Sequence, residues 1–296
     1  MAAKAKPIIV GLGEVLWDML PSGKQLGGAP ANFTYHAHAL GGRGILVSRV
    51  GTDSLGTEIL ARLNRLGVDC RTVSRDPDHP TGTVEVTLDT QGHPEYIIHE
   101  DVAWDYIPYT HSLGDLAART DAVCFGTLCS RTHVSRSTVL RFLQETHPEC
   151  LRIYDVNVRQ SFYSHDLIDT LLNSASVVKL NHDELPIVAS LTECSRGDDT
   201  ATIAALMSKY DLTAFAMTRG AHGSLLQVGN HRADHPGISG DVQDTVGAGD
   251  SFTAALASGL LRGDHPETIN EHANRVAAYV VSQTGATPPL PAELID

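Results

Sequence analysis

The chain has 296 residues, of which 42% are apolar and 19% are charged, and this composition excludes a largely disordered protein. There are 35 acidic and 22 basic residues, which gives a formal net charge of −13. Nucleic-acid backbones and anionic membrane surfaces need clustered positive charge, so we expect no binding to either, although a few local groups can still hold a small anion.

The cysteines and the N-terminal segment bear on where the protein works. The five cysteines are odd in number and lack C-x-x-C spacing, which disfavours a disulfide framework and a zinc ribbon. The first apolar run, residues 7–20, is interrupted by Glu14 and Asp18 and is too short to span a bilayer. No secretory signal pattern is present, so we expect a cytoplasmic protein with reduced cysteines.

The first third of the chain begins with alternating strand and helix patterns. The expected elements are a buried strand at 8–10, a helix at 31–40 that starts near Pro30, a strand at 44–50, and a helix with Leu55, Ile59, Leu63 and Leu66 on one face. The segment 82–98 differs. Its run of β-branched residues, its turn at 89–92 and its second strand pattern at 96–98 predict a hairpin, and hence a small sheet apart from the main one.

The rest of the chain alternates regularly between strand and helix. Strands are expected at 122–125, 151–154, 177–180 and 213–217, and helices at 135–146, 167–174, 201–210, 248–261 and 268–282. This alternation predicts an α/β fold in three layers, α/β/α, with a mainly parallel sheet covered by helices on both faces. Ligands of such folds bind at the carboxyl ends of the strands.

The motif with the most specific chemistry is Asp-Thr-Val-Gly-Ala-Gly-Asp at 244–250. The small residues Gly247, Ala248 and Gly249 permit a tight turn into a helix, whose free N–H groups form an anion site. A carboxylate there, Asp250, makes sense as a base toward a neutral hydroxyl group beside that anion, which suggests phosphoryl transfer. The plainer interpretation is a helix start with an acid in its first turn.

A second motif, Gly-Gly-Ala-Pro-Ala-Asn at 27–32, opens the first expected helix. Its glycines allow a ligand to approach the backbone, and Asn32 offers a donor and an acceptor to a polyol. Taken alone, the motif is also compatible with an ordinary loop-to-helix junction.

Together the two motifs resemble the N-terminal and C-terminal signatures of the ribokinase-like (PfkB) carbohydrate kinases, in the expected order and about 200 residues apart. The resemblance covers nearly the whole chain, and neither a Walker A motif nor a protein-kinase catalytic loop is present. It implies one ribokinase-like catalytic domain over 1–296, with a small β-sheet lid from segments of approximately 14–30 and 82–105. The resemblance also allows a homodimer that forms through this lid.

The resemblance also implies roles for individual residues. Asp250 matches the catalytic base, and Gly247, Ala248 and Gly249 match the anion hole. The acceptor-binding positions are Asp18, Gly27, Gly28, Asn32, Asn157 and Arg159. The ATP-binding positions are Asn181, Glu184, Thr218, Arg219, Gly220, Gly223 and Asn274. Glu184 acts indirectly on Mg²⁺, and backbone near Asp244, Val246 and Gly285 matches a K⁺ site.

The acceptor that best fits the resemblance is fructose. The stretches Gly-Glu-Val-Leu-Trp-Asp at 13–18 and Asp-Val-Asn-Val-Arg at 155–159 look like fructokinases, but residues 160–163 depart from that branch. Ribose, a nucleoside and ketodeoxygluconate stay open as acceptors. A catalytically silent sugar or nucleotide sensor is the alternative of another class. A Rossmann oxidoreductase is weakly supported, because Gly11 and Gly13 lack a third glycine.

Overall fold

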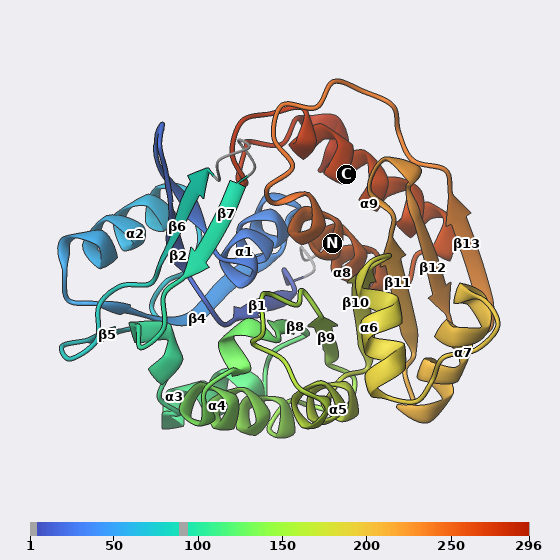
Figure 1. Ribbon diagram of the computed structural model, residues 1–296, viewed down its shortest axis with the longest axis horizontal. Coiled ribbons are helices and arrows are strands. Elements are labelled where there is room, and N and C mark those ends of the chain that lie inside the picture. The colour runs from blue at the N-terminus through green and yellow to red at the C-terminus, as the bar shows by residue number, and fades with distance from the viewer. Residues whose placement is uncertain (1–4, 89–93, 296) are drawn as a thin grey trace.

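The computed structural model describes residues 5–88 and 94–295, in which a large sheet lies beside a small one (Figure 1). The large sheet has the strand order β13-β12-β11-β10-β9-β8-β1-β4-β5. Its strands are β1 (Ile8–Leu12), β4 (Arg43–Gly51), β5 (Val73–Asp76), β8 (Ala122–Gly126), β9 (Leu151–Asp155), β10 (Val177–Asn181), β11 (Ala214–Thr218), β12 (Ser224–Val228) and β13 (His231–His235). The strands from β11 to β5 run parallel, as predicted, whereas β12 and β13 add an antiparallel hairpin at one edge.

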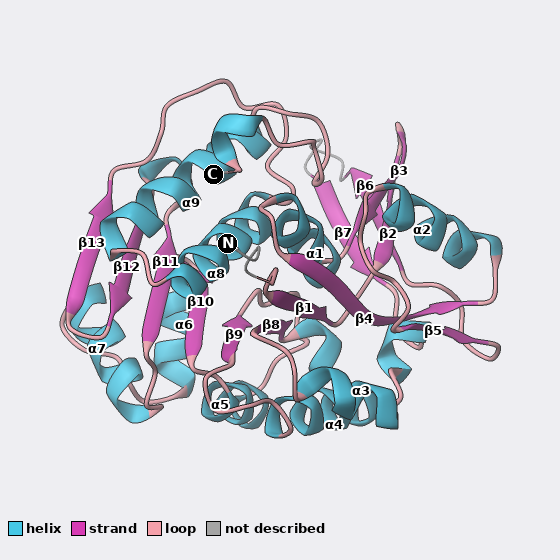
Figure 2. Cartoon of the chain, turned by 180° about the vertical axis from the view of Figure 1, so that it is seen from behind, coloured by secondary structure: helices cyan, strands magenta, loops and turns pink. Residues whose placement is uncertain are grey.

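Helices cover both faces of the large sheet, which confirms the predicted three layers (Figure 2). One face carries α1 (Ala29–Ala39), α8 (Ala248–Arg262) and α9 (Pro266–Val281). The other carries α3 (His111–Ala117), α4 (His133–Gln144), α5 (His165–Ser174), α6 (Glu184–Leu191) and α7 (Asp199–Lys209). Neighbouring residues of a strand point to opposite faces. In β8, Cys124 packs in the core under α1 and α8, and Phe125 packs in the core above α4 and α5.

The small sheet has the order β3-β2-β6-β7. It is built from two distant segments, β2 (Leu16–Leu20) with β3 (Gly23–Gly27), and β6 (Thr83–Leu88) with β7 (Pro94–Ile98). The predicted hairpin at 82–98 is therefore confirmed, and its turn at 89–92 lies outside the described residues. The ends of the two expected lid segments belong elsewhere, because Ala29 begins α1 and residues 103–105 lie in the short helix η1 (Ala103–Tyr106). Helix α2 (Ser54–Arg65) shares a core with Trp17 of β2.

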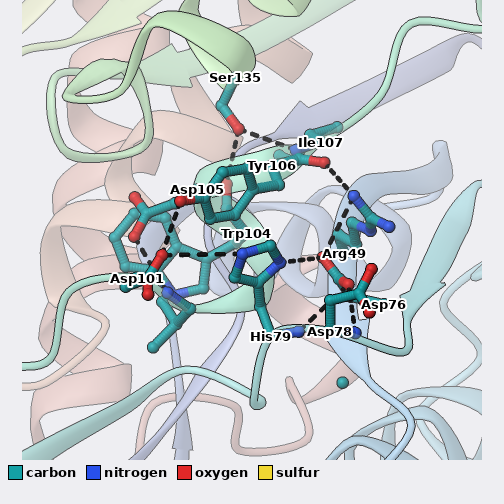
Figure 3. A network of polar contacts seen from close by, with 12 residues as sticks. Arg49, Asp76, Asp78, His79, Asp101, Trp104, Asp105, Tyr106, Ile107 and Ser135 are labelled. Carbon is teal, nitrogen blue, oxygen red and sulfur yellow. Dashed lines mark hydrogen bonds and ion pairs between the residues drawn. The ribbon is translucent and has the colours of Figure 1, made fainter.

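A polar network joins η1 to β4 and β5, at one edge of the large sheet (Figure 3). The buried carboxylate of Asp76, at the end of β5, lies 3.1 Å from Nη1 of Arg49 and 2.9 Å from Nδ1 of His79. The His79 ring stacks on Tyr106 with 3.8 Å between ring centroids, and the Tyr106 hydroxyl donates to Asp101. These contacts fix the chain that leaves β7, so the base of the small sheet is anchored to the main sheet.

A buried ion pair between Arg131 and Asp105 also anchors the base of the small sheet. Arg131, just after the short helix η2 (Leu128–Ser130), donates from Nε and Nη2 to the two carboxylate oxygens of Asp105 at 2.8 and 2.7 Å. Its guanidinium also covers the ring of Trp104 and donates to the backbone carbonyl of His99. Trp104 is a core residue. In the described part of the chain, no helix is long and apolar enough to cross a membrane.

Candidate active site at the start of helix α8

Asp250 lies in the first turn of α8, which the small residues before it shape. Gly247 is the residue that caps the helix and has a φ of 81°, a left-handed conformation that favours glycine. A Cβ at this position would also lie 2.7 Å from the carbonyl oxygen of Ala286. The first N–H groups of a helix have no intrahelical acceptor, so the segment 247–249 presents donors to an anion.

The two sequence motifs meet at Asp250. Nδ2 of Asn32, in the first turns of α1, donates to Oδ2 of Asp250 at 2.8 Å. Burial and the nearby charge of Asp155 raise the pKa of Asp250 to about 6, while Asn32 and the cations Lys179 and Arg159 lower it. A carboxyl group with a pKa close to neutrality suits a general base, because it is ionised at pH 7 and still has appreciable proton affinity.

Asp18 lies against the glycine pair that precedes α1. Asp18 projects from β2, and a Cβ on Gly27 would lie only 2.3 Å from its Oδ2, so only glycine permits the carboxylate at this distance from the turn. Gly28, with a φ of 104°, packs equally closely on the backbone of Glu14. Burial raises the pKa of Asp18 to about 6, and Arg159 opposes that shift.

Asn157 and Arg159 follow β9 at the carboxyl edge of the large sheet. Asn157 has a φ of 38° and lines a small cavity together with Glu14 and Asp155. The Arg159 charge lowers the pKa of Asp18, Glu14 and Asp250, which places its guanidinium within electrostatic reach of all three carboxyl groups. The structure thus gathers the predicted catalytic and acceptor-binding residues around one place.

An ion pair that the sequence analysis missed supports α8 from below. Nζ of Lys179, in the middle of β10, lies 3.0 Å and 3.1 Å from the two carboxylate oxygens of Asp155 at the end of β9. Thr253 of α8 donates to the same carboxylate at 3.0 Å, and a Cβ on Gly249 would approach Nζ to 2.9 Å. The available signal was a single lysine within the otherwise apolar run Val-Val-Lys-Leu at 177–180.

The residues predicted to bind ATP lie further along the same sheet edge. The side chain of Asn181, at the end of β10, accepts from the N–H groups of Asp183 and Glu184, and so caps α6. Both Glu184 oxygens accept from backbone N–H groups, of Val158 at 3.0 Å and of Asn181 at 2.8 Å. Thr218 ends the adjacent strand β11. Nucleotide binding by these residues stays a prediction.

Two other residues that were predicted to bind ATP, Arg219 and Asn274, make hydrogen bonds to other parts of the chain. Arg219 pairs with Asp234 at 2.7 Å and donates to the carbonyl of His235, which ties the loop of Gly220 and Gly223 to β13. Asn274 of α9 is buried, and its amide donates to Ser224 at 2.7 Å. These residues shape the loop and helix that border the predicted nucleotide position, and any contact with the nucleotide itself stays a prediction.

The donor sets can be compared with the two predicted cations. Mg²⁺ retains several waters and is usually held by one or two carboxylates together with phosphates. Each oxygen of Glu184 accepts one backbone hydrogen bond and keeps a second lone pair, which suits an indirect role through such waters. For K⁺, the two oxygens of Asp244 accept from the N–H groups of Val246 and Gly285 at 3.0 and 3.1 Å. Asp244 therefore holds together the two backbone segments that were predicted to form this site.

Comparison with known proteins identifies the family. The model of the pfkB family carbohydrate kinases matches residues 22–293. The chain belongs to this family. It is therefore a carbohydrate kinase, as the two motifs predicted, and the Rossmann oxidoreductase alternative is wrong.

Three relatives of this kinase illustrate the match. It is 30% identical to a fructokinase of Escherichia coli, with 95% of each chain covered. It is 29% identical to an ATP-dependent 6-phosphofructokinase of Thermoanaerobacterium thermosaccharolyticum, with 96% of this chain and 90% of the relative covered. The crystal structure of an uncharacterized sugar kinase, PH1459, from Pyrococcus horikoshii in complex with ATP superposes with a TM-score of 0.79 at 27% identity, covering 95% and 94% of the two chains.

Proposed function

We propose that this kinase transfers the γ-phosphoryl group of Mg-ATP to a hydroxyl group of fructose. The observation that carries the proposal is the placement of Asp250 at the N-terminus of α8, held by Asn32 and within the field of the same Arg159 that acts on Asp18. ATP as donor is supported by the relatives that are named or solved with it. The proposal includes a cytoplasmic location and a K⁺ ion beside Asp244.

The geometry suggests how the chain's own residues act. Asp250 accepts the proton of the acceptor hydroxyl group as the oxygen forms its bond to the γ-phosphorus. The bond from that phosphorus to the bridging oxygen breaks, and ADP leaves. The N–H groups of 247–249 stabilise the charge on the moving phosphoryl group. Charge neutralisation on the phosphates would come from a bound Mg²⁺, on which Glu184 would act indirectly. The small sheet excludes water that would compete with the sugar.

The charges around Asp250 favour a neutral acceptor over a phosphorylated or carboxylated one. Two carboxyl groups, those of Asp18 and Asp250, lie within the field of Arg159, which lowers the pKa of both. The other nearby cations are committed, because Arg131 pairs with Asp105 and Lys179 with Asp155. An anionic acceptor would be repelled by this arrangement, whereas the hydroxyl groups of an uncharged sugar can donate to the carboxylates.

The test is ADP release by the purified protein from Mg-ATP in the presence of KCl, with and without fructose. We expect turnover that depends on fructose and little with fructose 6-phosphate. The panel continues with ribose, nucleosides and ketodeoxygluconate. A higher kcat/KM with one of these would replace fructose as the acceptor. ATP binding without turnover on the whole panel would favour the silent sensor instead.

Asp250→Asn tests the role of the base. We expect kcat to fall by about 100-fold or more, because general-base catalysis commonly contributes that much. The matched control is Asp115→Asn, an exposed acid on α3, which should leave kcat unchanged. Near-wild-type turnover by Asp250→Asn with an intact fold would overturn the mechanism.

A further inference from the structure

The mechanism above leaves one buried carboxyl group at the site without a task. Glu14 follows β1 and has only 3% of its surface exposed. Its Oε2 atom is buried and has no hydrogen-bond partner among the described residues. A buried polar atom without a hydrogen-bond partner costs about 1 to 3 kcal/mol and is rare in folded proteins, so a bound group is expected to satisfy Oε2.

The surroundings of Glu14 indicate a ligand. Its side chain lines a cavity of about 10 Å³ at the carboxyl ends of β1, β8 and β9. Thr127, Asp155 and Asn157 line the same cavity, together with Ala29 and Pro30. A volume of this order holds about one water molecule or one hydroxyl group. A second buried acceptor close by, Oδ1 of Asn32, also lacks a partner in the described structure, although Nδ2 of the same amide holds Asp250.

The charges that face Glu14 come from three different elements. They are Asp250 of α8, Arg159 after β9 and Arg131 after η2. Burial is the largest influence and Asp250 adds to it, so the pKa of Glu14 is raised to about 7, above that of Asp250 at about 6. Two adjacent buried carboxyl groups disfavour being ionised together, which favours one proton on this pair.

We propose that Glu14 binds the acceptor directly, with its carboxyl group and the small cavity receiving a sugar hydroxyl group other than the one that is phosphorylated. The proposal rests on the proposed function and assigns one more specificity-determining residue to it. In this role the carboxyl group is neutral and its O–H donates to the oxygen of the sugar hydroxyl. A neutral partner beside ionised Asp250 avoids placing two adjacent negative charges in a buried site.

The test compares Glu14→Gln with Glu14→Ala, and uses the acceptor that has the highest kcat/KM with the wild-type protein. Glutamine keeps the shape and a donor, so we expect its acceptor KM to stay within about threefold of wild type near pH 6. Alanine removes the contact, and we expect KM to rise by about 10- to 100-fold with kcat nearly unchanged, because the contact is made equally in ground and transition states. Glu149→Gln, an exposed residue, is the matched control.

The pH dependence separates a substrate contact from a structural role. In the wild type, acceptor KM should rise as Glu14 loses its proton above about pH 7, and Glu14→Gln should abolish that rise. Each monodeoxy analogue of the acceptor is then tested on wild type and Glu14→Ala. The analogue that lacks the bound hydroxyl group should lose affinity with the wild type but lose no more with the variant.

Three results would overturn the inference. One is an acceptor KM of Glu14→Ala within twofold of wild type. Another is a Glu14→Gln variant that retains the alkaline rise in KM. The third is a fall in kcat at constant KM in both variants, which would indicate a structural role. If no acceptor on the panel is turned over by the wild type, the proposed function fails first and this inference falls with it, so the two failures are distinguishable.

Discussion

Asn32 and Asp250 lie 218 positions apart in the sequence, yet the amide of Asn32 donates to the carboxylate of Asp250 at 2.8 Å. The bond joins the first turns of α1 and α8, which cover the same face of the large sheet. Each helix opens with one of the two family motifs. The N-terminal motif therefore acts on the proposed catalytic base, because Asn32 favours the ionised form of Asp250.

Asn32→Ala should weaken Asp250 as a base near neutral pH. The loss of a hydrogen bond to a charged group, worth about 1.5 to 3 kcal/mol, should move the acid limb of the kcat profile upward by about one to two pH units. The measurement is kcat against pH from about 5 to 9, with Asn64→Ala, exposed on α2, as the control. An acid limb that does not move in Asn32→Ala would show that this bond has no influence on the base.

The raised carboxyl pKa values predict how stability depends on pH. The folded state binds the Glu14 proton more tightly than the unfolded state, with a pKa of about 7 against 4.5. Stability from this group is therefore fully present below the unfolded pKa and is lost as pH rises through about 7. Asp18 and Asp250 behave in the same way at lower pH, with pKa values of about 6. His36, whose pKa is lowered to about 4, has the opposite effect at acidic pH.

Between about pH 6.5 and 8, Glu14 dominates this balance and should cost on the order of 1 kcal/mol of unfolding free energy. Urea denaturation of the ligand-free protein across this range measures it, and Glu14→Gln should flatten the decline. Equal slopes for the two proteins would contradict the raised pKa of Glu14.

Lys179 should contribute to stability mainly by compensating Asp155. Lys179→Met would leave a buried carboxylate unpaired, for which we expect a loss of about 3 to 5 kcal/mol in unfolding free energy. The double variant Asp155→Asn/Lys179→Met should recover a large part of that loss, because no buried charge is left alone. A double-mutant cycle by urea denaturation checks this. If the two substitutions proved additive, the pair would not be coupled.

The parts of the site that the sequence predicted depend on local chemistry. Small residues that open a helix, with an acid in its first turn, mark an anion site, so Asp250 and Gly247 could be singled out without knowing their neighbours. The strand and helix pattern also predicted most element bounds to within a few residues, since buried parallel strands are short apolar runs.

The parts that the sequence did not predict depend on spatial neighbours. The pair of Lys179 and Asp155 forms only because β9 and β10 are adjacent in the sheet. The residues of a single strand do not determine which strand lies beside it. The hairpin of β12 and β13 was missed because β13, His-Arg-Ala-Asp-His, is polar and buries only its central Ala233. Glu14 looked like an interruption of an apolar run, and its isolation within the core became visible only in three dimensions.

His36 should position the backbone that forms the proposed K⁺ site. Its Nε2 lies 2.8 Å from the carbonyl oxygen of Ala286, and the low pKa keeps the buried ring neutral, so Nε2 carries the proton and donates. Ala286 follows Gly285, whose N–H donates to Asp244, and it also packs against Gly247. One side chain of α1 therefore holds the segment that adjoins both the N-terminus of α8 and Asp244.

His36→Leu should leave the Ala286 carbonyl without its donor and loosen this segment. The readout is the thermal midpoint in KCl compared with NaCl at equal ionic strength, because a cation that binds only the folded state raises that midpoint. We expect wild type to be more stable in KCl, His36→Leu to lose most of the difference, and His36→Gln, which keeps a donor, to restore it. If His36→Leu lowered the midpoint equally in both salts, the histidine would stabilise the fold without positioning the cation segment.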